Sequence, residues 1–180
     1  MAEARRPNRN FVLFLLAAIY AVSFIDRQIT SILAGPIRSE FHLTDTQLGW
    51  LGGPAFAILY AAVGLPAAWL ADRFSRTWMI TGALALWSGF TAASGMAVTS
   101  AQLFMARIGV GVGEAGGTAP SYSLIADYFP ERERGRAMAL YAMGVPVGGA
   151  LGVLLGGIIG HAWGWRAAFL GVGLVGVVLA

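Results

Sequence analysis

Four ionisable side chains lie inside long apolar stretches of the sequence: Asp26, Arg27, Arg107 and Glu114. A charged group in the hydrocarbon core of a bilayer costs several kcal/mol, so residues of this kind are functional candidates by default. The two carboxylates could gain and lose a proton. The two guanidinium groups stay protonated and are suited to pair with a carboxylate or a phosphate. The chemistry to consider first is therefore proton exchange or anion binding inside a membrane.

Each of these side chains belongs to a polar stripe with helical spacing. The stripes are Ser23, Asp26, Arg27 and Thr30 in one stretch, and Arg107, Glu114, Thr118 and Ser121 in the other. A rise of about 1.5 Å per residue places Asp26, Arg27 and Arg107 at one depth, with Glu114 about 10 Å deeper. Polar stripes are not tolerated against lipid, so both are expected to face one shared aqueous cavity.

The whole sequence is strongly apolar, with 57% hydrophobic and only 12% charged residues. A soluble domain of this length could not bury so many apolar side chains, which indicates a lipid environment. Helices are expected, because no run alternates as a membrane β-strand does. We predict an all-α membrane protein, with a tail at 1–10 and a six-transmembrane-helix bundle at 11–180. Its helices are expected at about Phe11–Leu33, Leu48–Ala71, Trp78–Val98, Ala101–Ala126, Gly135–Gly160 and Arg166–Ala180.

The last of these runs, Arg166–Ala180, is shorter than the roughly 20 residues that a full span needs. We expect this sixth helix to be truncated, either because the chain is a fragment or because another segment completes it.

Arginine placement predicts the orientation in the membrane. One side receives Arg5, Arg6, Arg9, Arg73, Arg76, Arg132, Arg134 and Arg136, whereas the other receives only Arg38 and Arg166. Because positive residues collect on the cytoplasmic side, the N-terminus is expected in the cytoplasm. The protein is expected to be a multi-pass protein of the cell inner or plasma membrane, surrounded by membrane lipid. The same placement argues against nucleic acid as a partner.

The glycine pattern indicates close helix packing. Gly111-Val-Gly113-Glu-Ala-Gly116 matches the dinucleotide-binding pattern, but it lies inside a long apolar run with no strand before it. The fifth run has glycine at every fourth position from Gly148 to Gly160, which lets helix backbones approach closely in lipid. We therefore expect no nucleotide cofactor.

Other chemistries find little support in the sequence. The chain has no cysteine, which excludes disulfides and thiol catalysis within it. His42 and His161 fall in outer links, where a lone histidine is usually solvated, so no metal site is expected. There is no Gly-x-x-x-x-Gly-Lys loop for ATP and no serine–histidine–acid arrangement for hydrolysis. The protein is not expected to be an enzyme.

Three segments carry a resemblance to a known family. The link Leu70-Ala-Asp72-Arg73-Phe-Ser75-Arg76-Thr77 is similar to the loop between the second and third helices of the major facilitator superfamily, although Ser75 and Thr77 replace a usual glycine and a basic residue. Arg107-Ile-Gly-Val-Gly-Val-Gly-Glu114 resembles its fourth-helix motif, and Trp163-Gly-Trp165-Arg166 resembles the entry to its sixth helix. Phe24-Ile-Asp26-Arg27 and Gly113-Glu114-Ala-Gly resemble the Spinster-like branch.

The resemblance implies the N-terminal six-helix half of a secondary active transporter. In this family the first and fourth helices line a central cavity, which agrees with the two polar stripes. The Spinster-like branch implies lipid-like or amphiphilic organic solutes, and the family implies alternating access. Because burial favours the neutral acid and a nearby guanidinium favours the carboxylate, we expect Asp26, Glu114 or both to change protonation during transport. The resemblance also implies an inner-gate charge latch of Asp72, Arg73, Arg76 and Asp127, which docks onto a C-terminal six-helix half absent from this sequence.

Three alternatives stay open at this point. The cavity arginines would also suit an organic-anion/proton symporter. The four buried charges could form a static ion-pair network that only fixes helix register. The chain could also be a non-transporting six-helix fragment or interaction module.

Overall fold

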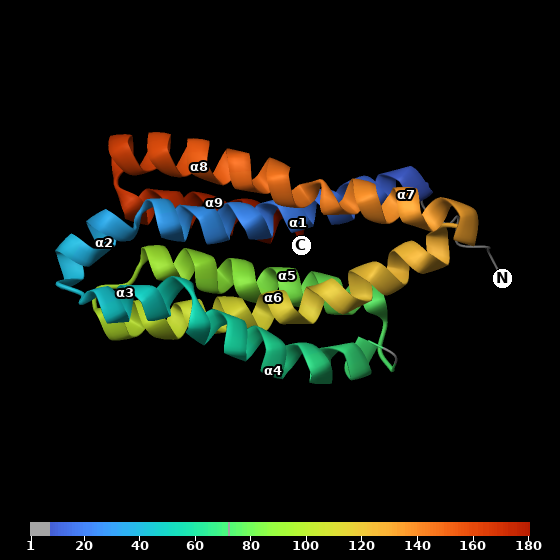
Figure 1. The fold of residues 1–180 in the computed structure, drawn as a ribbon, viewed down its shortest axis with the longest axis horizontal. Helices are drawn as coiled ribbons and strands as arrows, with labels where there is room; N and C mark the ends of the chain where they lie inside the picture. Colours follow the sequence, from blue (N-terminus) through green and yellow to red (C-terminus); the bar gives the residue numbers. More distant parts are fainter. Residues whose placement is uncertain (1–7, 72) are drawn as a thin grey trace.

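The computed structural model describes residues 8–71 and 73–180, and these are almost entirely helical. Its helices lie along one long axis (Figure 1). They are α1 (Arg9–Ile32), α2 (Ala34–Phe41), α3 (Asp45–Gly52), α4 (Pro54–Ala71), α5 (Arg76–Gly95), α6 (Ser100–Tyr128), α7 (Glu131–Ala142), α8 (Gly144–Trp163) and α9 (Trp165–Leu179). The all-α architecture is as the sequence predicts.

Short breaks interrupt the helices at three places, inside the second and fifth expected spans and at the end of the first. A break at Leu33 separates α1 from α2, one at Gly53 separates α3 from α4, and one at Met143 separates α7 from α8. The first span therefore continues as helix through the expected link, up to Phe41. The next helix, α3, starts at a capping box in which Thr44 and Gln47 satisfy each other's backbone amides.

The packing of the helices has an internal symmetry. The first span packs on the fifth through α1 and α8, and the fourth packs on the second through α6 and α4. The third and sixth spans pack on each other through α5 and α9. Exchanging spans 1–3 with spans 4–6 leaves these three pairs unchanged, so α1 and α6 hold equivalent places in them. The close packing of α5 on α6 lies outside this symmetry, because α9 packs much less extensively on α1.

Glycine brings the paired helices close together. A Cβ at Gly152 of α8 would lie 2.6 Å from the Gln28 Cβ and 3.0 Å from the Ile25 carbonyl of α1. A Cβ at Gly113 of α6 would lie 2.7 Å from the Trp87 Cβ of α5. Gly113 of the dinucleotide-like pattern therefore lies where only a hydrogen atom fits, as in close helix packing in lipid.

Large apolar side chains cover the outside of the bundle. Phe14 is 72% exposed, Leu65 79%, Trp78 77% and Val178 85%. By length and hydropathy alone, two stretches among the described residues pass as membrane spans, Arg9–Ile32 and Glu131–Trp163. The apolar helical stretches Tyr60–Leu70 and Trp165–Leu179 are shorter. An exterior of this kind suits hydrocarbon and would be a liability in water.

Candidate functional site

The four buried charges form two ion pairs between α1 and α6, which we call the reciprocal ion pairs. In one, the Asp26 carboxylate of α1 meets the Arg107 guanidinium of α6. In the other, the Arg27 guanidinium of α1 meets the Glu114 carboxylate of α6. Each helix thus supplies one acid and one base, so the four formal charges sum to zero.

The Asp26–Arg107 pair is the more deeply buried of the two. Its side chains are 0% and 6% exposed, and Arg107 Nη1 lies 2.7 Å from Asp26 Oδ2. The approach does not meet hydrogen-bond geometry, and neither Asp26 oxygen has a hydrogen-bond partner among the described residues. The other face of the Arg107 guanidinium lies over the Phe169 ring of α9, 5.6 Å from its centroid. Within the described ranges, the ion pair that the structure shows for the Asp26 carboxylate is the one with Arg107.

The Arg27–Glu114 pair combines a charge contact with hydrogen bonds. Arg27 donates from Nε at 2.9 Å and from Nη2 at 2.5 Å, and both bonds end on Glu114 Oε2. The Glu114 side chain is 2% exposed, whereas that of Arg27 is 32% exposed. The second carboxylate oxygen, Oε1, has no hydrogen-bond partner in the described part of the chain. Arg27 thus binds one carboxylate oxygen of Glu114, and the other oxygen remains available to a further hydrogen-bond donor.

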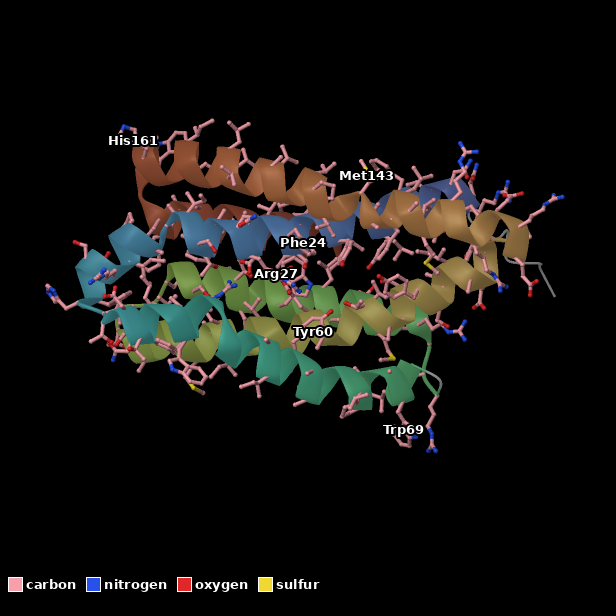
Figure 2. All side chains as sticks on the ribbon, in the orientation of Figure 1. Phe24, Arg27, Tyr60, Trp69, Met143 and His161 are labelled. Carbon is pink, nitrogen blue, oxygen red and sulfur yellow. The ribbon has the colours of Figure 1, made fainter. Side chains whose placement is uncertain are left out.

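Aromatic rings enclose the guanidinium of Arg27. Its central carbon lies 5.0 Å from the centroid of the Phe24 ring and 5.4 Å from that of Tyr60. The Tyr60 hydroxyl in turn lies 2.7 Å from the Thr118 hydroxyl, which ties α4 to α6. Figure 2 shows Phe24, Arg27 and Tyr60 converging between α1 and α4. Cation–π contact of this kind adds to the attraction that holds the Arg27 guanidinium in place.

The remaining members of the two polar stripes lie on the same two helices as the ion pairs. Thr30 donates to the Asp26 carbonyl, and Ser121 donates to the Gly117 carbonyl, so both hydroxyls bond within their own helices. Ser23, Thr118 and Ser121 line a small cavity beside Glu114. The structure therefore gathers the stripes on facing sides of α1 and α6.

Only part of the expected latch is brought together by the structure. Arg76, at the start of α5, forms an ion pair with Asp127 near the end of α6. Arg73 lies over the Trp69 ring, 3.9 Å from its centroid. Asp72 lies outside the described residues.

The opposite end of the bundle has a charge cluster that was not anticipated. Glu40 at the end of α2 accepts hydrogen bonds of 2.7 Å from Trp165 Nε1 and Arg166 Nη1 at the start of α9. Arg166 also donates to the Ala97 carbonyl at 2.9 Å. These hydrogen bonds, led by that from Arg166, lower the pKa of the Glu40 carboxyl. The Trp165-Arg166 motif thus fastens the first, third and sixth spans to one another.

The sequence did not predict the tyrosines that lie near the ion pairs. Tyr60 was overlooked because the second apolar run showed no polar stripe, and only its packing against α6 brings it to Arg27. Tyr20 of α1 and Tyr141 of α7 stack with centroids 4.6 Å apart beneath the ion pairs. In the sequence each of these tyrosines is a single polar group within an apolar run. Such a group can be assigned to a site only once the packing of the helices is known. No group of three histidine, cysteine or acidic side chains gathers as a metal site in the ranges the structure describes.

Comparisons with known proteins agree with this geometry. The family model of the Major Facilitator Superfamily matches residues 16–180. An MFS-type efflux pump of Mycolicibacterium smegmatis is 35% identical, over 99% of this chain and 42% of that protein. A probable L-galactonate transporter of Escherichia coli is 32% identical, over 94% of this chain and 37% of that protein.

Solved structures give the same result. The crystal structure of a bacterial homolog to the human lysosomal transporter Spinster, inward-facing and unoccupied, matches with a TM-score of 0.91. It is 36% identical over 98% of this chain and 42% of that chain. The chain thus spans about two fifths of the length of the relatives that it matches. It belongs to the major facilitator superfamily of multi-pass membrane transporters, with Spinster-like proteins among its structural neighbours.

Proposed function

We propose that the whole protein is a secondary active transporter that moves lipid-like or amphiphilic organic solutes by alternating access and is coupled to protons. The observation that carries the proposal is the pair of reciprocal ion pairs, which join α1 and α6 deep inside the bundle. Buried charges at the interface of structural repeats are typical of transporter sites near the bilayer midplane.

The proposed proton coupling rests on two opposing influences on each carboxylate, burial and a neighbouring guanidinium. Burial favours the neutral acid, whereas a neighbouring guanidinium favours the carboxylate. A movement that separates the arginine from the carboxylate, or that admits water, tips this balance and changes the number of bound protons. Glu114 is the better placed of the two acids, because its partner Arg27 is 32% exposed and can also meet a solute.

The solute binds, in this proposal, where Arg27 meets its aromatic neighbours. An anionic head group would pair with the guanidinium, while apolar parts would contact Phe24 and Tyr60. A head group that takes over Arg27 would leave Glu114 unpaired and favour its protonation, which couples solute binding to proton binding. The Spinster homologs among the structural neighbours support a lipid-like solute.

Small organic anions are the second candidate class of solute. The probable L-galactonate transporter, and a probable galactarate/D-glucarate transporter of Escherichia coli that is 30% identical, support it. Both classes share an anionic group for Arg27 to bind and differ in the apolar surface that must be buried.

The orientation is proposed from the placement of arginine. Arg9 at the start of α1, Arg76 at the start of α5, and Arg132, Arg134 and Arg136 in α7 belong to one end of the bundle, which would be cytoplasmic. At the same end, the Arg76–Asp127 ion pair is proposed as part of a latch that stabilises one access state. A second six-helix bundle would supply the other wall of the cavity.

Flux measurements on the whole protein in proteoliposomes test the proposal. A lysophospholipid and galactarate would be offered separately, each with and without an inward pH gradient. Accumulation of the lysophospholipid that depends on the gradient and is lost in Glu114→Gln is the expected result. Uptake of galactarate alone would assign the second class. Gradient-independent uptake in the wild type, or full coupling retained in both Glu114→Gln and Asp26→Asn, would leave the ion pairs a static structural role.

A further inference from the structure

A small cavity lies beside the Glu114 carboxyl group, on the side away from Arg107. Its volume is about 30 Å³. It extends along α6 from Glu114 toward Ser121, and so toward the end of the bundle where α1 begins. Five hydroxyl groups line it, those of Tyr20, Ser23, Thr118, Ser121 and Tyr141.

The unpartnered oxygen of Glu114 requires an explanation. Oε1 is buried and accepts no hydrogen bond from the described residues, although Oε2 accepts two from Arg27. A buried polar atom without a partner is costly, and an ordered water is the usual remedy. A water needs roughly 10–15 Å³ and two or more polar partners, and both conditions are met by this cavity.

The side chains that the structure places around Glu114 include no group that readily accepts its proton, which leaves water as the acceptor. The charged groups that face Glu114 are Asp26 and Arg27 of α1 and Arg107 of its own helix. From α4 comes the neutral Tyr60, and from α7 the neutral Tyr141. Helix α5 presents only apolar side chains to the cavity, those of Ile80, Ala83, Leu84 and Trp87. Arginine cannot take a proton from the acid, because it already carries its own.

We propose that this cavity holds the water through which Glu114 exchanges its proton, and that Ser121 and Tyr141, two helical turns toward the inner end, are positioning residues whose hydroxyls hold the water that receives the proton next. In the step, the O–H bond of protonated Glu114 breaks and the proton joins a lone pair of the cavity water. The carboxylate that remains is neutralised by Arg27, and the hydronium passes a proton to the next water toward the inner end. The inference rests on the proposed proton coupling at Glu114 and adds the acceptor.

Gly117 offers a way to fill the cavity without disturbing its walls. A Cβ at Gly117, which lines the cavity, would lie 3.7 Å from the Ala83 Cβ, an ordinary van der Waals contact. Gly117→Ala therefore adds one methyl group to the wall of the cavity and reduces the space left for water. Gly89→Ala is the matched control, because Gly89 is an exposed helical glycine with no atom within 4 Å of its added Cβ. Tyr141→Phe removes one hydroxyl but keeps the ring that stacks on Tyr20.

Infrared difference spectroscopy of the whole protein during a pH titration reads out the step directly. The band of the protonated Glu114 carboxyl is identified by its loss in Glu114→Gln. In Gly117→Ala it should shift to higher frequency and exchange with D₂O about tenfold more slowly, as expected when a hydrogen bond to water is lost. Tyr141→Phe should show a smaller shift, and Gly89→Ala none.

The outcomes separate the two levels of the proposal. If no titrating band disappears in Glu114→Gln, proton coupling at this residue fails, and the water pocket fails with it. If Glu114 titrates but Gly117→Ala leaves both the band and its exchange rate as in the wild type, only the water pocket is wrong. A circular dichroism spectrum and a gel-filtration profile like those of Gly89→Ala ensure that a folded variant is being compared.

Discussion

Removing one member of the Asp26–Arg107 pair should destabilise the protein far more than removing a surface ion pair of the same length. Asp26→Asn keeps the size of the side chain but removes its charge. The reciprocal ion pairs then hold two arginines against one carboxylate, a net charge of +1 inside the bundle. Arg107 then keeps its cation–π contact with the Phe169 ring, 5.6 Å from the ring centroid, and its electrostatic interaction with Glu114.

The magnitude follows from burial. Both side chains are almost fully buried, at 0% and 6% exposure, so the orphaned guanidinium cannot turn to water. Breaking a buried pair by removing one partner costs about 3–5 kcal/mol. The Arg38–Asp45 pair has the same 2.7 Å separation, but its side chains are 51% and 81% exposed. Arg38→Gln should therefore cost about 1 kcal/mol or less.

Titration of the purified whole protein with SDS, followed by tryptophan fluorescence, measures these losses in unfolding free energy. The double variant Asp26→Leu/Arg107→Met should recover most of the loss of Asp26→Asn, because replacing both charges leaves none unpaired. A loss below about 1 kcal/mol in Asp26→Asn, equal to that of Arg38→Gln, would refute the reasoning. It would mean that the pair is hydrated or that Asp26 is already neutral.

Three further results are expected from other contacts. Gly152→Ala should lower the unfolding free energy by about 1–3 kcal/mol, because its methyl group would overlap with α1. Gly157→Ala is the control, because no atom lies within 4 Å of its added Cβ, and SDS titration compares the two variants. Because the pKa of Glu40 is lowered in the folded protein, its carboxylate stabilises the fold above the unfolded pKa of about 4.3. This stabilisation is lost as the pH falls through the folded pKa. Across that range the melting temperature should therefore fall more in the wild type than in Glu40→Gln. Asp127→Asn should leave stability within about 1 kcal/mol, because the pair with Arg76 is partly exposed, but it should change the transport rate, and swapping the two charges should restore that rate; flux assays check it.

The sequence was sufficient for the helical bundle, but not for the partners of its buried charges. Helical spacing placed Asp26 and Arg27 on one face, and the glycine pattern predicted close helix contacts. Helical spacing also placed Glu114 about 10 Å below the layer of Asp26 and Arg27. The structure pairs Arg27 with Glu114 all the same. A long arginine side chain spans such an offset, and periodicity says nothing about where a flexible side chain ends.

The contributions of other helices could not be derived from sequence. Tyr60 reaches Arg27 because α4 packs on α6, and Tyr141 reaches Tyr20 because α7 packs on α1. Each is a single polar group in an apolar run, which has no periodicity to mark it. The Glu40–Arg166 contact joins residues 126 positions apart, and only the closed bundle brings them together.

Cysteine accessibility at Thr118 tests the central claim, that α1 and α6 turn their polar stripes toward a shared aqueous cavity. The chain contains no cysteine, so Thr118→Cys in the whole protein would be the one thiol of this region. We expect a membrane-impermeant thiol reagent to label it from one side of the membrane, and to leave Phe14→Cys, on the apolar exterior, unlabelled. Labelling of Thr118→Cys by a lipid-soluble maleimide alone, with no reaction from either aqueous side, would contradict the account.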